Sequence, residues 1–369
     1  MSSLPKRVLQ VIPSTGYGGI SSMLMNIYRS VDRNTLQFDF AAFNEGPLHD
    51  EIVAMGGRIF YFDYIKKQGI FSYMRAFRNL IQEQGPYQAV HVHNGYKGGF
   101  ALKAARQAGI NKRVCHIHTS NVEQAWQRAI VPLLKFAAIA NATDLLACGE
   151  EAGRFMYGRR PFDVLTNAIN SSSYSSQSQS DRSTMRAQLG IPLDCLVIGH
   201  VGRLSEVKNH FFIINIADCL KQQHPELCFC FVFIGDGPLR HDLEQAIRSK
   251  GLEQHVMFAG LRSDIPDLLQ AFDIYVFPSL FEGLPVSLLE AQASGLPCLV
   301  SAGVPYEADI GAGLVRFMDL TEGSARWAAA LLEWAARGRG DTRESELRLI
   351  NKGYNIEENV RKLMHIYQL

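Results

Sequence analysis

Two glutamates around a predicted helix start form the residue pattern with the clearest chemistry. The apolar run 273–277 predicts a strand, and the pattern of 286–294 predicts a helix after it. Glu282 lies on the connecting loop, where Gly283 permits a tight turn, and Glu290 lies between one and two turns into the helix. A helix start at the carboxyl end of a strand favours a phosphate, and carboxylates can bind ribose or sugar hydroxyls. An isolated pair would be interpreted as solvated glutamates, but the strand–loop–helix context favours binding.

Two cations follow another predicted strand, at residues 196–201. Arg203 and Lys208 lie on the loop between this strand and a helix expected to begin near Asn209. Arginine can hold phosphate oxygens bidentately, and lysine adds a compact charge. The pair could neutralise a diphosphate, although two surface cations would give the same pattern.

A glycine-rich turn, Gly16-Tyr-Gly-Gly19, follows the first predicted strand. Glycines such as Gly18 and Gly19 let backbone N–H groups approach a phosphate closely. The turn is similar to a dinucleotide-binding fingerprint, but Ser21 stands where the third glycine belongs. By itself the turn is therefore weak evidence for a phosphate site.

Two histidine couples, His91-Val-His93 and His116-Ile-His118, lie at the ends of predicted strands. Strand alternation puts the two members of each couple on one face. Four histidines could bind zinc and make the protein a metal hydrolase, but no carboxylate accompanies them at metal-ligand spacing. We therefore expect substrate-binding histidines in a cleft, with at least one or two of the four buried as core residues.

The elements that position these residues alternate between strands and helices, which predicts parallel sheets with helices on both faces. The fold class expected is α/β, with two doubly wound Rossmann-like domains facing a central cleft. Ligands of such sheets bind beyond the carboxyl ends of the strands. The predicted parts are an N-terminal domain at 1–170, a Ser-rich linker or loop at 171–182, a C-terminal domain at 183–353, and a helix at 354–369 that packs back on the N-terminal domain.

Charge divides the chain unevenly, although the net charge is only +1. Residues 1–170 hold 19 Lys and Arg against 12 Asp and Glu, whereas the remainder holds 18 against 24. A basic first half suggests an anionic partner such as a membrane surface or a lipid diphosphate, and a solvated basic face is the alternative. The apolar segment 129–142, which is too short to span a bilayer, could lie on a membrane surface or form a buried helix, and we favour the buried helix.

The seven cysteines form no Cys-x-x-Cys pair, and Cys228 and Cys230 are expected to be small core residues. The sequence begins without an apolar signal core. These features predict a reducing cytoplasmic location, with peripheral contact on the cytoplasmic membrane face as a further expectation.

Taken together, the motifs resemble the family-four retaining glycosyltransferases of GT-B fold, especially bacterial capsule, exopolysaccharide and O-antigen enzymes. Seven landmarks occur in the family's order along nearly the whole chain. They are Gly18-Gly19, Val90-His-Val-His93, His116-Ile-His118, Val164-Leu-Thr-Asn-Ala-Ile-Asn170, Gly202-Arg-Leu with Lys208-Asn209, Gly235-Asp-Gly-Pro238, and Glu282 through Glu290 with the family's spacing.

The resemblance implies a role for each matched residue. Glu290 should bind the ribose of the nucleotide, and Glu282 with the backbone of Gly283 and Leu284 should hold the donor sugar. Arg203 and Lys208 should clamp the diphosphate. Three further assignments complete the implied set: Gly18 and Gly19 approach the donor from the other domain, His118 lies beside the donor sugar, and Gly235 belongs to the donor site.

The resemblance also implies a reaction and its partners. A sugar should move from a nucleotide-sugar donor to a saccharide or polyisoprenyl-diphosphate-linked acceptor, with retention of configuration, no metal, no cofactor and no nucleic acid. The sequence departs from the family at Ala168 and Asn170, where glycine and aspartate are common, and at Ile20-Ser21, where many members carry a glutamate. Two other functions remain open, a nucleotide-sugar epimerase of the same fold and a non-catalytic sugar-nucleotide-binding protein.

Overall fold

The structure is a computed structural model that describes residues 4–119, 129–174 and 182–369. The chain forms two compact units. Unit 1 comprises Met1–Ala168 together with Ile356–Leu369, and unit 2 comprises Ile169–Asn355. The last helix therefore belongs to unit 1. The Ser-rich segment begins with the 3₁₀ turn Ser171–Tyr174, which belongs to unit 2.

Unit 1 is built on a parallel seven-stranded sheet of order β3-β2-β1-β4-β5-β6-β7. Its strands are β1 Lys6–Ser14, β2 Leu36–Asn44, β3 Ile59–Tyr61, β4 Ala89–Val92, β5 Lys112–Ile117, β6 Asp144–Ala147 and β7 Asp163–Val164. Its helices are α1 Gly19–Ser30, α2 His49–Ala54, α3 Ile65–Gln68, α4 Ile70–Gln84, α5 Gly99–Gln107, α6 Val131–Asn141, α7 Glu150–Tyr157 and α15 Ile356–Tyr367.

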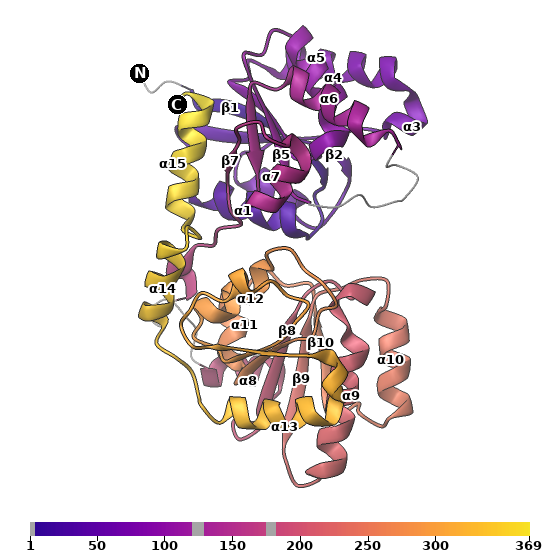
Figure 1. Cartoon of the computed structure of the whole chain (residues 1–369), viewed down its shortest axis with the longest axis vertical. Coiled ribbons are helices and arrows are strands. Elements are labelled where there is room, and N and C mark those ends of the chain that lie inside the picture. The colour runs from indigo at the N-terminus through magenta and orange to yellow at the C-terminus, as the bar shows by residue number, and fades with distance from the viewer. Residues whose placement is uncertain (1–3, 120–128, 175–181) are drawn as a thin grey trace. The chain divides into compact units, whose positions relative to one another are not determined.

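Strand alternation gives this sheet two apolar faces, and each is covered by helices. Val8 and Phe38 face α1 and α15, whereas Leu9 and Val90 face α4 and α5. The C-terminal helix α15 lies beside α1 (Figure 1). Its apolar side, including Leu363 and Tyr367, is buried in this core.

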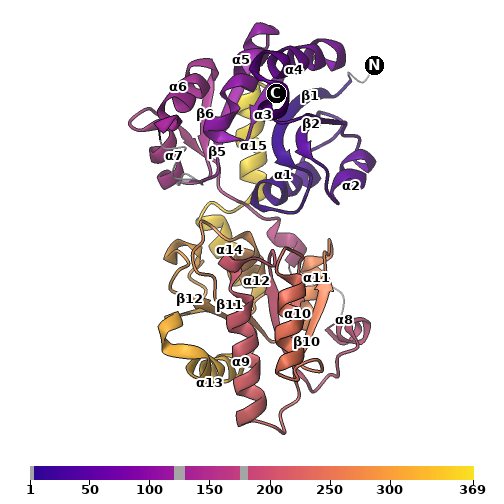
Figure 2. The ribbon, with the colours of Figure 1, turned by 90° about the vertical axis from the view of Figure 1, so that its right-hand side faces the viewer.

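Unit 2 repeats the plan with a parallel six-stranded sheet of order β10-β9-β8-β11-β12-β13. Its strands are β8 Leu196–Val201, β9 Phe229–Ile234, β10 Val256–Gly260, β11 Ile274–Phe277, β12 Cys298–Ser301 and β13 Val315–Met318. Its helices are α8 Arg182–Leu189, α9 His210–Gln223, α10 Arg240–Ser249, α11 Ile265–Ala271, α12 Val286–Ala293, α13 Gly323–Ala335 and α14 Thr342–Asn351. Helices α9 and α10 cover the face turned to the viewer in Figure 2, and α8, α11, α12 and α14 cover the other.

The two predicted parallel sheets are confirmed, and the strands predicted at 196–201 and 273–277 are found as β8 and β11, with limits that differ by at most one residue. Two strands were not predicted. The two-residue β7 is too short to give a pattern, and β13 carries Arg316 in an otherwise apolar run. The prediction that Cys228 is a core residue is wrong, because Cys228 is exposed at the residue before β9.

The apolar segment 129–142 forms α6, which is not the buried helix that the sequence favoured. Leu133 and Phe136 are 70% and 65% exposed, whereas Val131 and Ala138 are buried. Among the described residues, no helix combines the length and the apolar character needed to cross a bilayer.

Candidate substrate-binding site

Most of the predicted site residues lie at the topological switch point of one of the two sheets, whereas Gly235 and His118 follow the adjacent strands β9 and β5. In unit 2 the chain order reverses between β8 and β11, so the loops that leave these two strands diverge. A crevice opens at such a point beyond the carboxyl ends of the strands, and ligands of doubly wound sheets bind there. Arg203 and Lys208 lie on the loop after β8, and Glu282 lies on the loop after β11. The two loops that the sequence analysis predicted to carry site residues are therefore the two that border the switch point.

Direct hydrogen bonds tie these two loops together. Asn209 precedes α9 in a left-handed conformation with φ of 55°, which asparagine tolerates better than most residues. Its side-chain amide donates to the carbonyl of Pro278 at 3.1 Å, and the N–H of Leu280 donates to the carbonyl of Val207 at 2.8 Å. The loops are thus held in fixed register before any substrate binds.

Gly235 supports the loop after β8 through a close backbone approach. Its φ is 134°, and a Cβ atom added there would lie 2.1 Å from the carbonyl oxygen of Gly202. Only glycine fits that position. Gly235 therefore shapes the backbone that leads into Arg203, a structural reason for the glycine in addition to its implied place in the donor site.

Lys208 and Glu282 are brought together in an ion pair. The Nζ atom of Lys208 lies 2.6 Å from Oε1 of Glu282 and 4.5 Å from the centre of the Phe277 ring, and both charged side chains are less than one fifth exposed. Arg203 is exposed, and no ion pair of its guanidinium is found within the described part of the chain. The site thus offers one restrained cation and one cation free to reach a ligand.

Glu290 lies in α12 and is held by a residue that the sequence did not single out. The hydroxyl of Tyr174 donates to Oε1 of Glu290 at 2.9 Å. Tyr174 is buried and ends the Ser-rich 3₁₀ turn, so part of the predicted linker helps to build the site. Nothing in the spacing of Tyr174 and Glu290, 116 residues apart, could have signalled the contact.

Gly283 lies in a bend of the loop before α12, and this bend does not use a conformation that only glycine favours. Its φ is not positive, and a Cβ atom added to it would have no other group within 4 Å. The prediction that Gly283 permits a turn is consistent with this bend, although nothing in the described structure requires glycine there. Gly283 and Leu284 lie directly before the start of α12, whose N-cap residue is Pro285.

Beneath Lys208 lie two fully buried histidines, His200 and His210, whose rings meet edge to face at 4.6 Å. His200 donates from Nδ1 to the carbonyl of Val276 at 2.9 Å, because a carbonyl can only accept. Burial lowers the pKa of His210 to about 3 and lowers the pKa of His200 well below its usual range, and Lys208 adds to both shifts. Both rings are therefore neutral beside Lys208 at physiological pH.

In unit 1 the switch point lies between β1 and β4, and the glycine-rich turn follows β1. Gly18 and Gly19 have open space where a Cβ atom would stand, so packing within the described structure does not require glycine at either position. A Cβ atom at Gly46 would instead lie 2.3 Å from the backbone N of Gly16. Gly46 therefore packs directly against the glycine-rich turn, a contact that the sequence analysis did not predict.

The two histidine couples form one hydrogen-bonded chain on the sheet face covered by α1 and α15. We call it the histidine chain and define it, in order, as His118, His93, Gln10, Tyr367, His91 and His116. The distances between successive members are 3.0 Å from His118 Nε2 to His93 Nδ1, 2.9 Å from His93 Nε2 to Gln10 Oε1, 3.3 Å from Gln10 Nε2 to Tyr367 Oη, 2.6 Å from Tyr367 Oη to His91 Nδ1, and 3.2 Å from His91 Nε2 to His116 Nδ1.

Burial decides the charge of this chain. It lowers the pKa of His118 to about 3 and holds the pKa values of His91, His93 and His116 well below their usual range, with neighbouring histidines adding to the last three shifts. His91, His93 and His116 are core residues, and His118 is partly exposed just after β5. Three of the four histidines are thus buried and one is partly exposed, which agrees with the expectation that at least one or two of them are core residues.

The same cluster has the composition of a metal site. One ring nitrogen from each of His91, His93 and His116 lies within 4.8 Å of the others. Most of their ring nitrogens already form hydrogen bonds to one another, to Gln10 or to Tyr367, and the Nε2 of His116 is the exception. A metal ion would have to replace these bonds.

Models of two protein families match the chain. Residues 17–170 match Glycosyltransferase Family 4, and residues 181–334 match Glycosyl transferases group 1. The putative glycosyltransferase EpsF of Bacillus subtilis (strain 168) is 39% identical over 379 residues, which cover 100% of this chain and 98% of the relative. The UDP-Gal:alpha-D-GlcNAc-diphosphoundecaprenol alpha-1,3-galactosyltransferase of Escherichia coli is 25% identical and covers 77% of this chain and 76% of its own length.

A solved structure supports the fold. The crystal structure of Anabaena HepE in complex with UDP and glucose has a TM-score of 0.75 and 20% sequence identity, and it covers 97% of this chain and 98% of its own. The likeness agrees with the two Rossmann-like units found here.

Proposed function

Because this chain belongs to the family 4 glycosyltransferases, we propose that it moves a sugar from a nucleoside diphosphate sugar to a saccharide carried on a polyisoprenyl diphosphate. The reaction retains the anomeric configuration and serves the synthesis of a cell-surface polysaccharide. The Escherichia coli relative, whose name contains both a UDP-sugar and a diphosphoundecaprenol acceptor, supports this choice of substrates.

The observation that carries the proposal is the arrangement at the unit 2 switch point. Lys208 and Glu282 are paired at 2.6 Å at the end of two tied loops, and Glu290 follows in α12. Lys208 and Arg203 supply positive charge for a diphosphate, while Glu290 can accept hydrogen bonds from a ribose. Glu282 binds hydroxyls of the transferred sugar, together with the backbone N–H groups of Gly283 and Leu284.

The mechanism follows from where charge develops. As the bond between the sugar and the diphosphate breaks, the leaving diphosphate gains negative charge. Arg203, Lys208 and the start of α12 lie where that charge can be stabilised, and such preorganised groups usually make the largest contribution to rate. The acceptor hydroxyl attacks from the face that the diphosphate leaves, and a departing phosphate oxygen takes its proton. In unit 1, Gly18, Gly19 and His118 contribute hydrogen-bonding groups to substrate.

Point substitutions test the donor assignment. We expect Glu290→Ala and Lys208→Ala each to lower kcat/KM for sugar transfer at least tenfold, which corresponds to about 1.4 kcal/mol of lost transition-state stabilisation. Lys250→Ala is the matched control, because Lys250 also forms an ion pair in unit 2, with Asp218 at 2.7 Å, but lies away from the switch point. Wild-type kinetics in both site variants would disprove the donor assignment.

Product and binding assays separate the alternative functions. An epimerase would convert the donor with no acceptor present, and a non-catalytic protein would bind donor without turnover across a broad acceptor panel. A thermal-shift screen of UDP, GDP and ADP sugars identifies the base, since a ligand at 100 times its Kd stabilises the native state by about 2.7 kcal/mol.

Catalysis is proposed to need no metal and no cofactor. The cations Arg203 and Lys208 provide the charge that a divalent ion would supply to a diphosphate. The mutual hydrogen bonds of the histidine chain offer a second argument, because they already occupy most of the nitrogens that a metal would need. Full activity after EDTA treatment, with no bound zinc by elemental analysis, is the expected result, and loss of activity that zinc restores would contradict it.

A lipid-linked acceptor implies that the protein meets a membrane surface, and we propose that α6 makes this contact. Ile130, Leu133 and Phe136 are exposed there. Lys135 does not join them, because its Nζ hydrogen bonds to the carbonyl of Phe155 and lies 3.5 Å from that ring. Leu133→Glu should reduce sedimentation with anionic phospholipid vesicles, and Leu347→Glu, at an exposed leucine of unit 2, should not. Equal binding of both variants would contradict the proposal.

A further inference from the structure

The histidine chain has a direction, and Gln10 reveals it. An amide oxygen can only accept a hydrogen bond, so the contact of His93 Nε2 with Gln10 Oε1 requires a proton on that nitrogen. The neutral His93 ring then has a bare Nδ1, which accepts from Nε2–H of His118. Since His118 is neutral as well, its own Nδ1 is bare. That atom has no partner within the residues that the structure describes.

The other half of the chain runs in the same direction. Gln10 donates from Nε2 to the hydroxyl of Tyr367, and the hydroxyl proton then goes to Nδ1 of His91. The 2.6 Å separation of Tyr367 Oη and His91 Nδ1 agrees, because it is typical of a hydroxyl donor and shorter than the usual N–H···O range. His91 in turn donates from Nε2 to Nδ1 of His116.

Turning the Gln10 amide over would reverse every bond of the chain. His93 would then donate from Nδ1, and His118 would carry its proton on Nδ1 instead of Nε2. One buried amide, which contacts Tyr367 on its nitrogen side, therefore determines whether His118 presents an acceptor or a donor. Gln10 and Tyr367 are both 0% exposed, so solvent does not compete for these bonds.

We propose that Gln10 and Tyr367 are positioning residues that hold His118 with its proton on Nε2, so that Nδ1 accepts a hydrogen bond from a substrate sugar hydroxyl. The C-terminal helix thereby sets the protonation of a residue just after β5 through a chain of hydrogen bonds. This inference rests on the proposed function for the role of His118, whereas the tautomer itself is a property of the free protein.

The test is long-range proton–nitrogen NMR of the ¹⁵N-labelled full chain at pH 7.5, which distinguishes the two neutral tautomers and the charged ring. The sequence contains 11 histidines, and single substitutions assign the four of the chain. In the wild type, His118, His93, His91 and His116 should all be neutral with the proton on Nε2. A proton on Nδ1 of His118 in the wild type would overturn the proposal.

Two variants remove the groups that fix the direction of the hydrogen bonds in the histidine chain. Tyr367→Phe deletes the group that anchors the Gln10 amide, and Gln10→Met deletes the amide itself while keeping an apolar side chain of similar length. Each should add a second population of His118 with the proton on Nδ1. If one variant does not fold, the other still gives the measurement, and an unchanged His118 spectrum in the folded variant would overturn the proposal.

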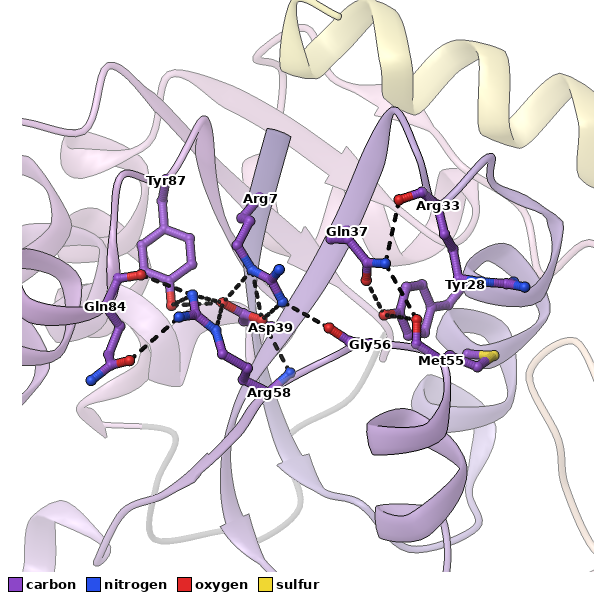
Figure 3. Close-up of polar contacts among 10 residues, drawn as sticks. All are labelled: Arg7, Tyr28, Arg33, Gln37, Asp39, Met55, Gly56, Arg58, Gln84 and Tyr87. Carbon is purple, nitrogen blue, oxygen red and sulfur yellow. Dashed lines mark hydrogen bonds and ion pairs between the residues drawn. The ribbon is translucent and has the colours of Figure 1, made fainter. Parts of the chain in front are cut away.

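Tyr28→Phe is the matched control. Tyr28 is also fully buried in unit 1, and its hydroxyl donates to the amide oxygen of Gln37 at 2.5 Å, in a tyrosine–glutamine pair that does not touch the histidine chain (Figure 3). Its loss should leave the His118 tautomer unchanged. A tautomer shift as large as that of Tyr367→Phe would show a nonspecific packing effect and would also overturn the proposal.

Kinetics separate this inference from the proposed function. Tyr367→Phe should lower kcat/KM about fivefold, equivalent to one neutral hydrogen bond of about 1 kcal/mol, and Tyr28→Phe should not. If His118→Ala is fully active, the role of His118 in substrate binding is wrong, whatever its tautomer. If His118→Ala is impaired but Tyr367→Phe changes neither tautomer nor rate, positioning by Tyr367 is wrong.

Discussion

Unit 1 contains two buried polar networks that differ in charge and in place. The first, which we call the Asp39 cluster, consists of Arg7, Asp39, Arg58 and Tyr87, and Figure 3 shows its contacts. Asp39 is 0% exposed, yet it bonds both arginines and the tyrosine hydroxyl. The second is the histidine chain, which is neutral and which, within the described residues, has one ring nitrogen without a hydrogen-bond partner at each end.

The two networks lie toward opposite edges of one sheet. Arg7, Arg58 and Tyr87 lie at or before the amino ends of their strands, whereas His93 and His118 follow the carboxyl ends. Ligands bind at the carboxyl edge in this fold. The saturated ionic network can contribute to stability, and the position of the neutral network agrees with the substrate-binding role that we propose for His118.

The pH dependence of stability should separate the networks most clearly. The lowered pKa values of the four chain histidines mean that the unfolded state binds protons below about pH 6.5 while the native state does not. Their stabilisation is complete above that pH and is lost as the pH falls. For the three fully buried rings the loss approaches about 4 kcal/mol per pH unit. Urea unfolding at pH 7.5, 6.5 and 5.5 measures the loss, to which the buried His200 and His210 of unit 2 also contribute, and a flat profile would contradict the neutral chain.

Asp39→Ala should cost the next largest amount. It removes the common partner of two arginines, and breaking a buried pair in this way costs about 3 kcal/mol. We place the effect at the lower end because the Arg7 and Arg58 side chains are 23% and 38% exposed and can reach water. Glu51→Ala, which breaks the more exposed pair of Arg29 and Glu51, should cost about 0.5 kcal/mol. Chemical denaturation reports both values, and equal losses would refute the distinction.

The Asp39 cluster should respond to acid in a different window. Burial alone would raise the pKa of Asp39, but hydrogen bonds and charge from Arg7 and Arg58 outweigh it and lower the pKa. Its stabilisation is therefore present above about pH 3.9 and is lost as the pH falls toward the lowered value. The stability difference between wild type and Asp39→Asn should be constant from pH 7.5 to 5 and shrink below pH 4. If this stability difference instead changed near pH 6, a histidine and not Asp39 would be titrating, and the prediction would be wrong.

The sequence was sufficient for most of the fold because buried parallel strands are continuous apolar runs. The residues of β8, Leu196–Val201, were predicted to the residue. It was also sufficient for local parts of the site, such as the loop that carries Lys208 before α9. Both depend on neighbours in the chain, which the sequence displays directly.

Contacts between distant parts of the chain could not be predicted from the sequence. Gln10 and Tyr367 are 357 residues apart, and Tyr174 reaches Glu290 across 116 residues. The histidine couples were visible as motifs, but the residues that join them had no pattern of their own. The sequence therefore displayed the motif residues that we propose bind substrate, but it did not display the distant residues that hydrogen-bond to them.

The smallest predicted effect concerns how losses combine. Tyr87→Phe removes a 2.9 Å bond to the charged Asp39, at about 1.5 kcal/mol, and Tyr367→Phe removes neutral bonds, at about 1 kcal/mol. Because the tyrosines belong to different networks, the double variant should lose their sum within about 0.5 kcal/mol. Tyr87→Phe combined with Asp39→Ala should instead lose less than the sum, since the partner of the hydroxyl is already gone. Urea unfolding of both double variants measures these free-energy losses. Strong coupling between Tyr87 and Tyr367 would mean that the two networks act as one.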